Sequence, residues 1–273
     1  MAVSRADRPL SVRSRTRMVR QEEIASYVLT HGVATPNELT EVVGASLMTI
    51  HRDLDELARR GLIRKFHGGV SATPSSVFES SSAFRMKVQP EHKEALAGEA
   101  MQRIEPGMSL MLDTSTTNLF LARHIARAGP MQLTVITNYV PILQTLRGCE
   151  DIDLIIIGGA YNANHESFFG MNAVEMAESL HVNLAILSTS SMTPRLTFHQ
   201  DQDIVTMKRA MMEAADRRLL LMDPTKIKHT ALHQLAPTSA FDELVITDPE
   251  DAEFIRSVGE HVRTTVIDVR GAS

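Results

Sequence analysis

Apolar positions recur at helical spacing through the first part of the chain. They predict three helices, at residues 17–31, 36–43 and 47–60. Thr35-Pro36-Asn37-Glu38 has the form of a capping box with proline at the first helical position, so it marks the start of the second helix. Residues 62–70 favour a hairpin around two glycines. Three helices followed by a hairpin are typical of a winged helix-turn-helix, whose third helix enters the DNA major groove.

From residue 91 onward, short apolar runs alternate with helical patterns. The runs predict strands at 109–112, 133–136, 154–157, 184–187, 219–222, 243–246 and 264–267. Helical patterns occupy 91–104, 117–128, 139–147, 171–180, 203–215 and 249–258. Buried strands separated by helices of this length favour a largely parallel sheet that is covered on both faces. The predicted fold class is therefore α/β, with an N-terminal winged helix-turn-helix joined to a C-terminal α/β domain.

The composition agrees with a two-domain globular protein. The chain has 273 residues, of which 43% are hydrophobic and 22% are charged. No apolar run approaches the roughly 18–20 residues that a membrane span needs, and the N-terminus lacks the apolar stretch of a signal peptide. A single cysteine, Cys149, excludes an internal disulfide framework and fits a reducing compartment. We therefore expect a cytoplasmic protein that does not associate with membranes.

The net charge of −5 is unevenly distributed along the chain. Residues 1–70 carry three more basic than acidic residues, whereas residues 91–273 carry nine more acidic than basic residues. Six arginines fall within the first twenty residues, opposed only by Asp7. A basic head on an acidic body is typical of a nucleic-acid-binding protein with a separate second domain, although a solvated tail would show the same charge.

These patterns predict four segments along the chain. The first three are a flexible basic arm at residues 1–16, a DNA-binding domain at 17–70 and a linker at 71–90, whose first part holds six serines and a proline. The C-terminal domain occupies 91–273. In the DNA-binding domain, the exposed side of the third helix is predicted to carry Ser46, Thr49, His51 and Arg52. A small helical bundle that only docks another protein is the alternative.

Polar residues follow six of the predicted strands, where a parallel sheet binds its ligands. Hydroxyl groups at a helix N-terminus suit an anion, because free backbone N–H groups and the helix dipole both point at it. Lys226 adds a positive charge, and Asp113 and Asn138 are candidates to hold sugar hydroxyls. Simple helix capping is the alternative explanation for each turn taken alone. No histidine pair has zinc-protease spacing, so no metal is predicted. Met207, Met211 and Met212 are expected to fill the core.

Several motifs resemble those of the DeoR family of bacterial transcriptional regulators. The first domain carries Ser46-Leu47-Met48-Thr49-Ile50-His51-Arg52-Asp53-Leu54 and Gly61-Leu62-Ile63-Arg64-Lys65-Phe66-His67-Gly68-Gly69-Val70. The second carries Leu112-Asp113 with Thr116-Thr117, Val135-Ile136-Thr137-Asn138, Ile157-Gly158-Gly159, Lys208-Arg209-Ala210-Met211 and Asp223-Pro224-Thr225-Lys226. The resemblance covers roughly residues 17–250 in family order.

The resemblance implies a winged helix joined to a sensor domain similar to sugar-phosphate isomerases and CoA transferases. Such a protein controls a sugar or polyol catabolic operon, often as a repressor that a phosphorylated intermediate releases. By position, Thr49, His51 and Arg52 would face double-stranded DNA, with Arg64, Lys65 and His67 in the wing. The effector site would be lined by Asp113, Thr116, Thr117, Asn118, Thr137, Asn138, Gly158, Gly159 and Lys226.

Two positions depart from the family pattern. His51 stands where arginine is common, which would change one contact with DNA. Ser115 stands where glycine is common, and if that position needed a positive φ, serine would be disfavoured there.

An enzyme is the alternative function, as a sugar-phosphate isomerase with an appended helical domain. An isomerase needs a positioned base, and Ser188–Ser191 stands where related isomerases have a carboxylate-rich loop. The prediction is therefore a regulator without catalytic residues or cofactor. A symmetric operator needs two recognition helices, so a homodimer or homotetramer is expected.

Overall fold

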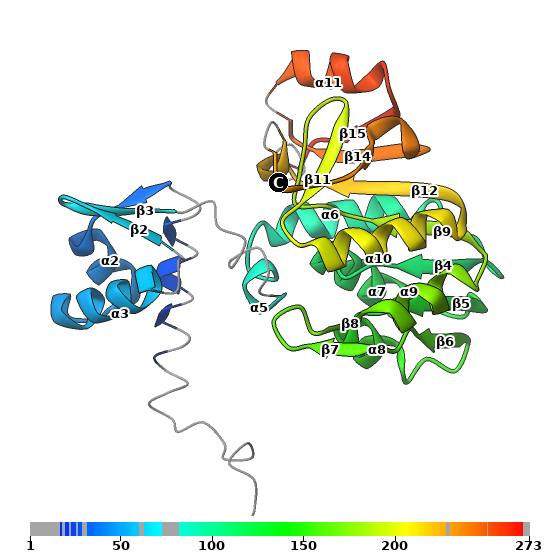
Figure 1. Ribbon diagram of the computed structural model, residues 1–273, viewed down its shortest axis with the longest axis horizontal. Coiled ribbons are helices and arrows are strands. Elements are labelled where there is room, and N and C mark those ends of the chain that lie inside the picture. The colour runs from blue at the N-terminus through cyan, green and yellow to red at the C-terminus, as the bar shows by residue number, and fades with distance from the viewer. Residues whose placement is uncertain are drawn as a thin grey trace, which may run out of the picture. The chain divides into compact units, whose positions relative to one another are not determined.

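The chain is described by a computed structural model that divides into two compact units, Met1–Glu79 and Ser80–Ser273 (Figure 1). The described residues are 17, 20–21, 23–25, 27–28, 32–59, 63–72, 82–227, 230–249 and 251–269. The predicted basic arm at 1–16 lies outside them. Each unit is considered by itself.

Helices of the first unit follow the predicted caps. The described residues between 17 and 28 are helical, as are α2 (Pro36–Val43) and α3 (Leu47–Arg59). Thr35 and Glu38 form the predicted capping box, because the Glu38 N–H donates to Thr35 Oγ1 at 3.3 Å and the Thr35 N–H donates to Glu38 Oε2 at 2.7 Å. Ser46 caps α3 by accepting a hydrogen bond from the Thr49 N–H at 3.3 Å.

The wing of this unit is a three-stranded antiparallel sheet. Strands β2 (Ile63–Phe66) and β3 (Gly69–Ala72) form the predicted hairpin, and the two-residue β1 (Val33–Ala34) pairs with β3 at its other edge. Gly68 has a φ of 87°, which suits the turn because glycine adopts a positive φ without steric cost. The prediction of a winged helix-turn-helix is confirmed, with β1 as an unforeseen third strand.

Asp53 ties the recognition helix α3 to the first helical segment. Its side chain is 1% exposed and accepts hydrogen bonds from Arg20 Nε at 2.6 Å and Gln21 Nε2 at 2.8 Å. The burial of a charged group is tolerated here because both carboxylate oxygens have donors. This pairing fixes the helix that carries the predicted DNA-facing side chains.

Replacing Asp53 by asparagine should lower the free energy of unfolding of the first unit by about 1.5–3 kcal/mol, because charge-assisted hydrogen bonds are lost in a buried position. Urea denaturation followed by circular dichroism measures the change. Glu41→Gln, at an exposed position on α2 of the same unit, is the matched control and should change little. Equal stability of Asp53→Asn and the native chain would contradict the prediction.

The second unit is built on one seven-stranded parallel sheet in the order β15-β14-β12-β9-β4-β5-β6. Its strands are β4 (Ser109–Leu112), β5 (Leu133–Thr137), β6 (Ile152–Ile156), β9 (Val182–Leu187), β12 (Ala215–Met222), β14 (Glu243–Thr247) and β15 (Arg263–Ile267). Each of the seven predicted runs lies on one of these strands, and the predicted fold class is confirmed.

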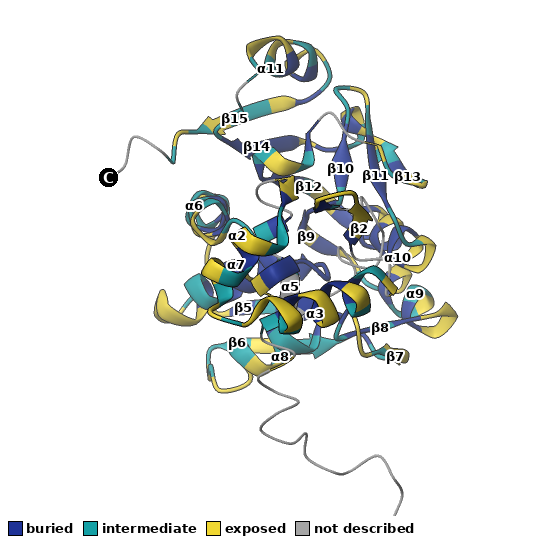
Figure 2. Ribbon diagram, turned by 90° about the vertical axis from the view of Figure 1, so that its left-hand side faces the viewer, coloured by how far each residue is buried: buried dark blue, intermediate teal, exposed yellow. Residues whose placement is uncertain are grey.

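Helices cover both faces of this sheet. Its helices are α6 (Pro90–Met101), α7 (Thr116–Arg127), α8 (Val140–Leu146), α9 (Met171–Glu178), α10 (Gln202–Glu213) and α11 (Ala252–Gly259). Along β4, Leu110 and Leu112 join the core beneath α6, α7 and α8, whereas Met111 joins the core beneath α9, α10 and α11. Figure 2 shows β9 and β14 buried, with exposed stretches on the covering helices.

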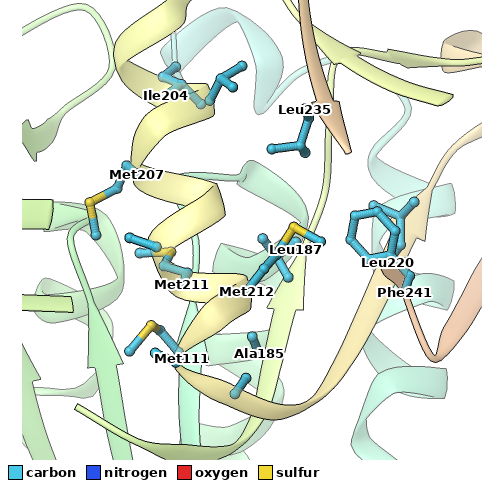
Figure 3. Packing of buried hydrophobic residues seen from close by; sticks show 14 of the residues in the cluster. Met111, Ala185, Leu187, Ile204, Met207, Met211, Met212, Leu220, Leu235 and Phe241 are labelled. Atoms are coloured by element: carbon cyan, nitrogen blue, oxygen red, sulfur yellow. The ribbon is translucent and has the colours of Figure 1, made fainter. Parts of the chain in front are cut away.

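Methionines fill one of the two cores, as expected. Met207, Met211 and Met212 of α10 are all buried and lie with Leu187 and Leu220 of the sheet (Figure 3). The flexible thioether side chain suits the irregular space between a helix and a twisted sheet.

Several short elements were not predicted. Strands β7 (Ala160–Asn162) and β8 (Ser167–Phe169) form a hairpin, and β10 (Ser191–Met192), β11 (Leu196–His199) and β13 (His233–Pro237) form a small antiparallel sheet. Two 3₁₀ turns occur, η1 (Pro224–Lys226) and η2 (Thr238–Ala240), and α5 (Ser82–Arg85) precedes α6. The predicted linker at 71–90 thus contains the end of β3 and all of α5.

No helix among the described residues is both long and apolar enough to cross a membrane.

Candidate functional site

The strand order places a candidate ligand site at the carboxyl ends of β4 and β9. From β4 the chain passes to β5 and β6 on one side, whereas β9, β12, β14 and β15 lie on the other. Ligands of parallel sheets bind at such a reversal. Asp113 follows β4 and Ser188 follows β9, and the Ser188 N–H donates to Asp113 Oδ2 at 2.9 Å.

Both carboxylate oxygens of Asp113 bond to protein groups at this point. Its carboxylate forms an ion pair with Lys208 of α10 and accepts a hydrogen bond from Asn118 Nδ2 at 2.8 Å. The two charged side chains are 1% and 3% exposed, respectively. Burial lowers the pKa of Lys208, and the charge of Asp113 opposes that shift. Asp113 therefore organises the site, since both of its oxygens already bond to protein groups.

Ser115 begins α7 without backbone strain. Its φ of −118° lies in the extended region, and its hydroxyl accepts a hydrogen bond from the Asn118 N–H at 3.1 Å. The requirement for a positive φ, considered in the sequence, does not apply here. Thr116, Thr117 and Asn118 form the buried first turn of this helix. Asn118 Oδ1 is buried and has no hydrogen-bond partner among the described residues.

Residues that follow β5 stabilise the neighbouring loops. Thr114 Oγ1 donates to Asn138 Oδ1 at 2.9 Å, and Asn138 Nδ2 donates to the Phe168 carbonyl at 2.9 Å. Thr137 Oγ1 donates to the Leu112 carbonyl at 2.7 Å. The structure thus brings the loops after β4 and β5 together, but it uses the Thr137 and Asn138 side chains internally.

Gly158 and Gly159 lie farther from the reversal, after the edge strand β6. A Cβ atom at Gly159 would lie 2.4 Å from the carbonyl oxygen of Phe169, so only glycine fits there. This close approach of two backbones explains Gly159 by packing.

Lys226 reaches the loop after β9 from η1. Its Nζ donates to Ser188 Oγ at 3.1 Å and lies 3.3 Å from Asp223 Oδ2. Although burial opposes ionisation of Asp223, the charge of Lys226 and a hydrogen bond from Thr225 lower its pKa. Lys226 is partly exposed and retains the position that the sequence predicted.

Two further cations come from residues that the sequence did not select. Arg85 ends α5 and its Nη1 donates to the Thr114 carbonyl at 3.2 Å. Lys93 of α6 is 2% exposed, and its Nζ donates to the Arg85 carbonyl at 2.5 Å and to the Val88 carbonyl. The segment from Ser82 to Pro90 is thereby fastened to the loop after β4. We call residues 82–90 the strap.

Ser82 anchors the other end of the strap to the sensor unit. Its N–H donates to the Asn164 carbonyl at 3.0 Å, and its hydroxyl hydrogen-bonds the buried hydroxyl of Tyr139. The strap therefore contacts the hairpin β7–β8, the start of α8 and the loop after β4.

The charge around Lys93 is predominantly positive. Burial, together with the charges of Lys226 and Arg85, lowers the pKa of Lys93 to about 7, against the opposing effect of Asp223. The three cations come from α5, α6 and η1, so the fold brings like charges together at one place. An anion bound there would reduce this repulsion.

The burial of Lys93 and Lys208 could have been predicted from their positions in the sequence. Lys93 lies three, four and seven residues before Leu96, Ala97 and Ala100, so it shares the apolar face of its helix. Lys208 lies likewise between Ile204 and Met211. A lysine inside an apolar stripe indicates a buried charge that needs a partner.

Two histidines also lie near these cations. His165 follows β7 and His199 ends β11, and both are buried. Burial lowers the pKa of each ring, and the charges of Arg85 and Lys208 lower it further. Both rings are therefore neutral near pH 7.

The third helix of the first unit presents the predicted DNA-facing residues. His51 and Arg52 are exposed, Ser46 is exposed at the helix start and Thr49 is half-buried beside it. Met48 is 67% exposed between them.

On the wing, Arg64, Lys65 and His67 are all exposed. Lys65 Nζ donates to Asp55 Oδ1 of α3 at 2.6 Å, and this hydrogen bond lowers the pKa of Asp55. The contact fastens the wing to the recognition helix.

Among the described residues, no group of three or more His, Cys, Asp or Glu side chains is arranged to hold a metal ion.

Comparison with known proteins identifies the two units. The first matches the DeoR-like helix-turn-helix domain over residues 20–76, and the second matches the DeoR C terminal sensor domain over residues 88–249. The protein is thus of the class that joins a DNA-binding helix-turn-helix to a sensor domain. The chain belongs to the DeoR family of transcriptional regulators.

Three relatives are similar over most of their length. An uncharacterised HTH-type transcriptional regulator YgbI of Escherichia coli is 32% identical, over 85% of this chain and 91% of that protein. The L-fucose operon activator of Haemophilus influenzae is 29% identical, over 82% and 90%. The glycerol-3-phosphate regulon repressor of Escherichia coli is 28% identical, over 89% and 95%.

Proposed function

We propose that this protein represses a sugar or polyol catabolic operon and is released from DNA by a phosphorylated sugar or polyol. The observation that carries the proposal is the gathering of Arg85, Lys93 and Lys226 at the strand-order reversal, where Asp113 is already neutralised by Lys208. A phosphate group supplies the negative charge that this place lacks and accepts several hydrogen bonds. The relatives named for fucose and glycerol 3-phosphate support this class of effector.

The strap offers a physical route by which effector binding would act on the DNA-binding unit. An anion bound by Arg85 and Lys226 would contact the segment that directly follows the DNA-binding unit in the chain. Binding would thereby change the restraint on that unit, which is the simplest route to release from an operator. The named relatives include both an activator and a repressor, so transcription with and without effector distinguishes the two.

The pairing of both carboxylates at the site with lysines argues against the isomerase alternative. Asp113 is paired with Lys208, and Asp223 with Lys226. A general base that moves a proton between adjacent carbons needs a carboxylate free to accept it.

The proposed function also implies a DNA partner, an oligomeric state and a cellular compartment. A symmetric operator of double-stranded DNA needs two copies of α3, so we propose a homodimer or homotetramer, whose mass light scattering measures. A DNA-binding regulator of this family would work in the cytoplasm.

Replacing Arg52 by alanine should weaken operator binding about 10- to 100-fold, because an exposed arginine on the recognition helix is lost from the DNA interface. Fluorescence anisotropy with DNA from upstream of the protein's own gene measures this at several salt concentrations. The native chain should show the salt dependence of phosphate contacts, with log K falling by about 0.9 per phosphate for each decade of salt.

Arg127→Ala is the charge-matched control, since Arg127 is exposed on α7 of the sensor unit. It should leave DNA affinity unchanged. An Arg52→Ala variant that binds the operator as tightly as this control would contradict the proposed DNA contact and favour a protein-docking module.

Anion affinity should rise as the pH falls from 8 to 6. Lys93, with a pKa of about 7, gains its proton over this range, and a charged Lys93 attracts the anion. The increase should be at most roughly tenfold, since the protonated fraction grows from about a tenth to about nine-tenths. Inorganic sulfate is the probe, because it stays a dianion throughout. Affinity for sulfate that is constant or rises with pH would contradict the prediction.

A further inference from the structure

His165 and His199 are oriented by one residue. His165 Nε2 lies 3.3 Å from Asp201 Oδ2, and the Asp201 backbone N–H donates to His199 Nδ1 at 3.1 Å. Asp201 is itself fixed as the N-cap of α10, where its Oδ1 accepts from the Asp203 N–H at 2.9 Å. One buried ring lies between β7 and β8, and the other ends β11. Both are therefore held in fixed orientations by the start of α10, the helix that carries Lys208.

These contacts assign the protons on both rings. The carboxylate of Asp201 places a proton on His165 Nε2, so His165 Nδ1 is left as an acceptor. His199 Nδ1 accepts a hydrogen bond, so its proton lies on Nε2, which is a donor. Burial keeps both rings neutral, as their lowered pKa values indicate.

The acceptor on His165 is without a partner. His165 Nδ1 is buried and has no hydrogen bond to any described residue, and the whole side chain is only 3% exposed. Buried polar atoms without partners are rare, because the lost hydration is not replaced. Both rings interact electrostatically with Arg85 and Lys208, and His199 also with Lys226, so they lie beside the proposed anion site.

Two other candidates for hydroxyl recognition, Asp113 and Asn138, already bond to protein groups. Asp113 binds Lys208, Asn118 and Ser188, and Asn138 exchanges hydrogen bonds with Thr114 and Phe168. A fully ionised phosphate group has no proton to donate to His165 Nδ1, whereas a hydroxyl group both donates and accepts.

We propose that His165 and His199 recognise a hydroxyl group of the effector, with His165 Nδ1 accepting its proton and His199 Nε2 donating to its oxygen. This inference rests on the proposed anionic effector and adds a requirement to it. The ligand must carry a hydroxyl group near its phosphate, so simple alkyl phosphates are poor effectors. The two histidines determine specificity, and the cations supply attraction.

The test compares phosphates that differ in hydroxyl groups. Calorimetry with the full chain uses inorganic phosphate, propyl phosphate, glycerol 3-phosphate, ribose 5-phosphate and glucose 6-phosphate. At least one hydroxylated phosphate should bind the native chain about tenfold or more tightly than propyl phosphate, because a site built to bond a hydroxyl rejects analogues that lack it. His165→Leu should abolish this preference, so that hydroxylated phosphates bind no more tightly than propyl phosphate.

Two variants keep the result interpretable. His165→Gln retains a side-chain acceptor and should retain part of the preference, and it serves if His165→Leu does not fold. His181→Leu is the control, since His181 is exposed and pairs with Asp216 at 2.8 Å. Propyl phosphate binding as tightly as every hydroxylated phosphate, or a preference that survives in His165→Leu, would overturn this inference alone. Absence of binding to every phosphate would overturn the anionic effector together with it.

Discussion

Replacing Asp113 by asparagine should lower the free energy of unfolding of the sensor unit by about 3–5 kcal/mol. Its carboxylate and the ammonium group of Lys208 are both almost fully buried and form an ion pair. Removing one charge leaves the other without a partner in a medium that solvates it poorly, so the loss exceeds that of an ordinary hydrogen bond. The same variant also disturbs the Ser188 N–H, which donates to Asp113 at 2.9 Å.

Urea denaturation of the full chain, followed by circular dichroism, measures the loss of stability. A double variant, Asp113→Asn with Lys208→Met, should recover a large part of it, because no buried charge remains. Asp203→Asn, at an exposed position on α10, is the control. The single variant should be less impaired at pH 9 than at pH 7, since a buried lysine with a lowered pKa releases its proton more readily at high pH. Native stability of Asp113→Asn at pH 7 would refute this role.

The sequence was sufficient for the sheet because its central strands are largely buried on both faces. Runs such as Leu184–Leu187 are apolar without interruption, and helices of ten or so residues separate them. These features also predicted that the polar residues following six of the strands would lie on one edge of the sheet. The short strands β7 and β10 were missed, because two or three residues carry too little periodicity to be distinguished from a loop.

The candidate site was predicted in part. Lys226 and the first turn of α7 were selected because they follow strands directly, and the structure places both near the reversal. Sequence spacing could not show that the Asp113 carboxylate forms an ion pair with Lys208, which is 95 residues away. Nor could it show that Arg85, within a segment of linker-like composition, reaches the Thr114 carbonyl. Pairings between distant elements depend on the packed structure, and no local pattern encodes them.

An Arg85→Met variant should bind its operator normally and no longer release it in response to effector. Arg85 is the part of the strap that contacts the loop after β4, and its charge acts on Lys93, His165, His199 and Lys208. An anion bound at this place would attract Arg85 directly, so effector binding would shift the position of the strap. Coupling between two sites typically changes affinity about 5- to 150-fold, and removing Arg85 should reduce that change to less than about threefold.

Anisotropy titrations of the operator, with and without the phosphate that binds best in calorimetry, measure this coupling. Lys226→Met provides the comparison, because Lys226 lies at the same place but outside the strap. It should weaken effector binding itself, so that high effector concentration restores release. Arg85→Met should remain unresponsive even when calorimetry shows the site to be occupied. If both variants recover full release at saturating effector, Arg85 only contributes affinity, and the strap does not transmit the signal to the DNA-binding unit.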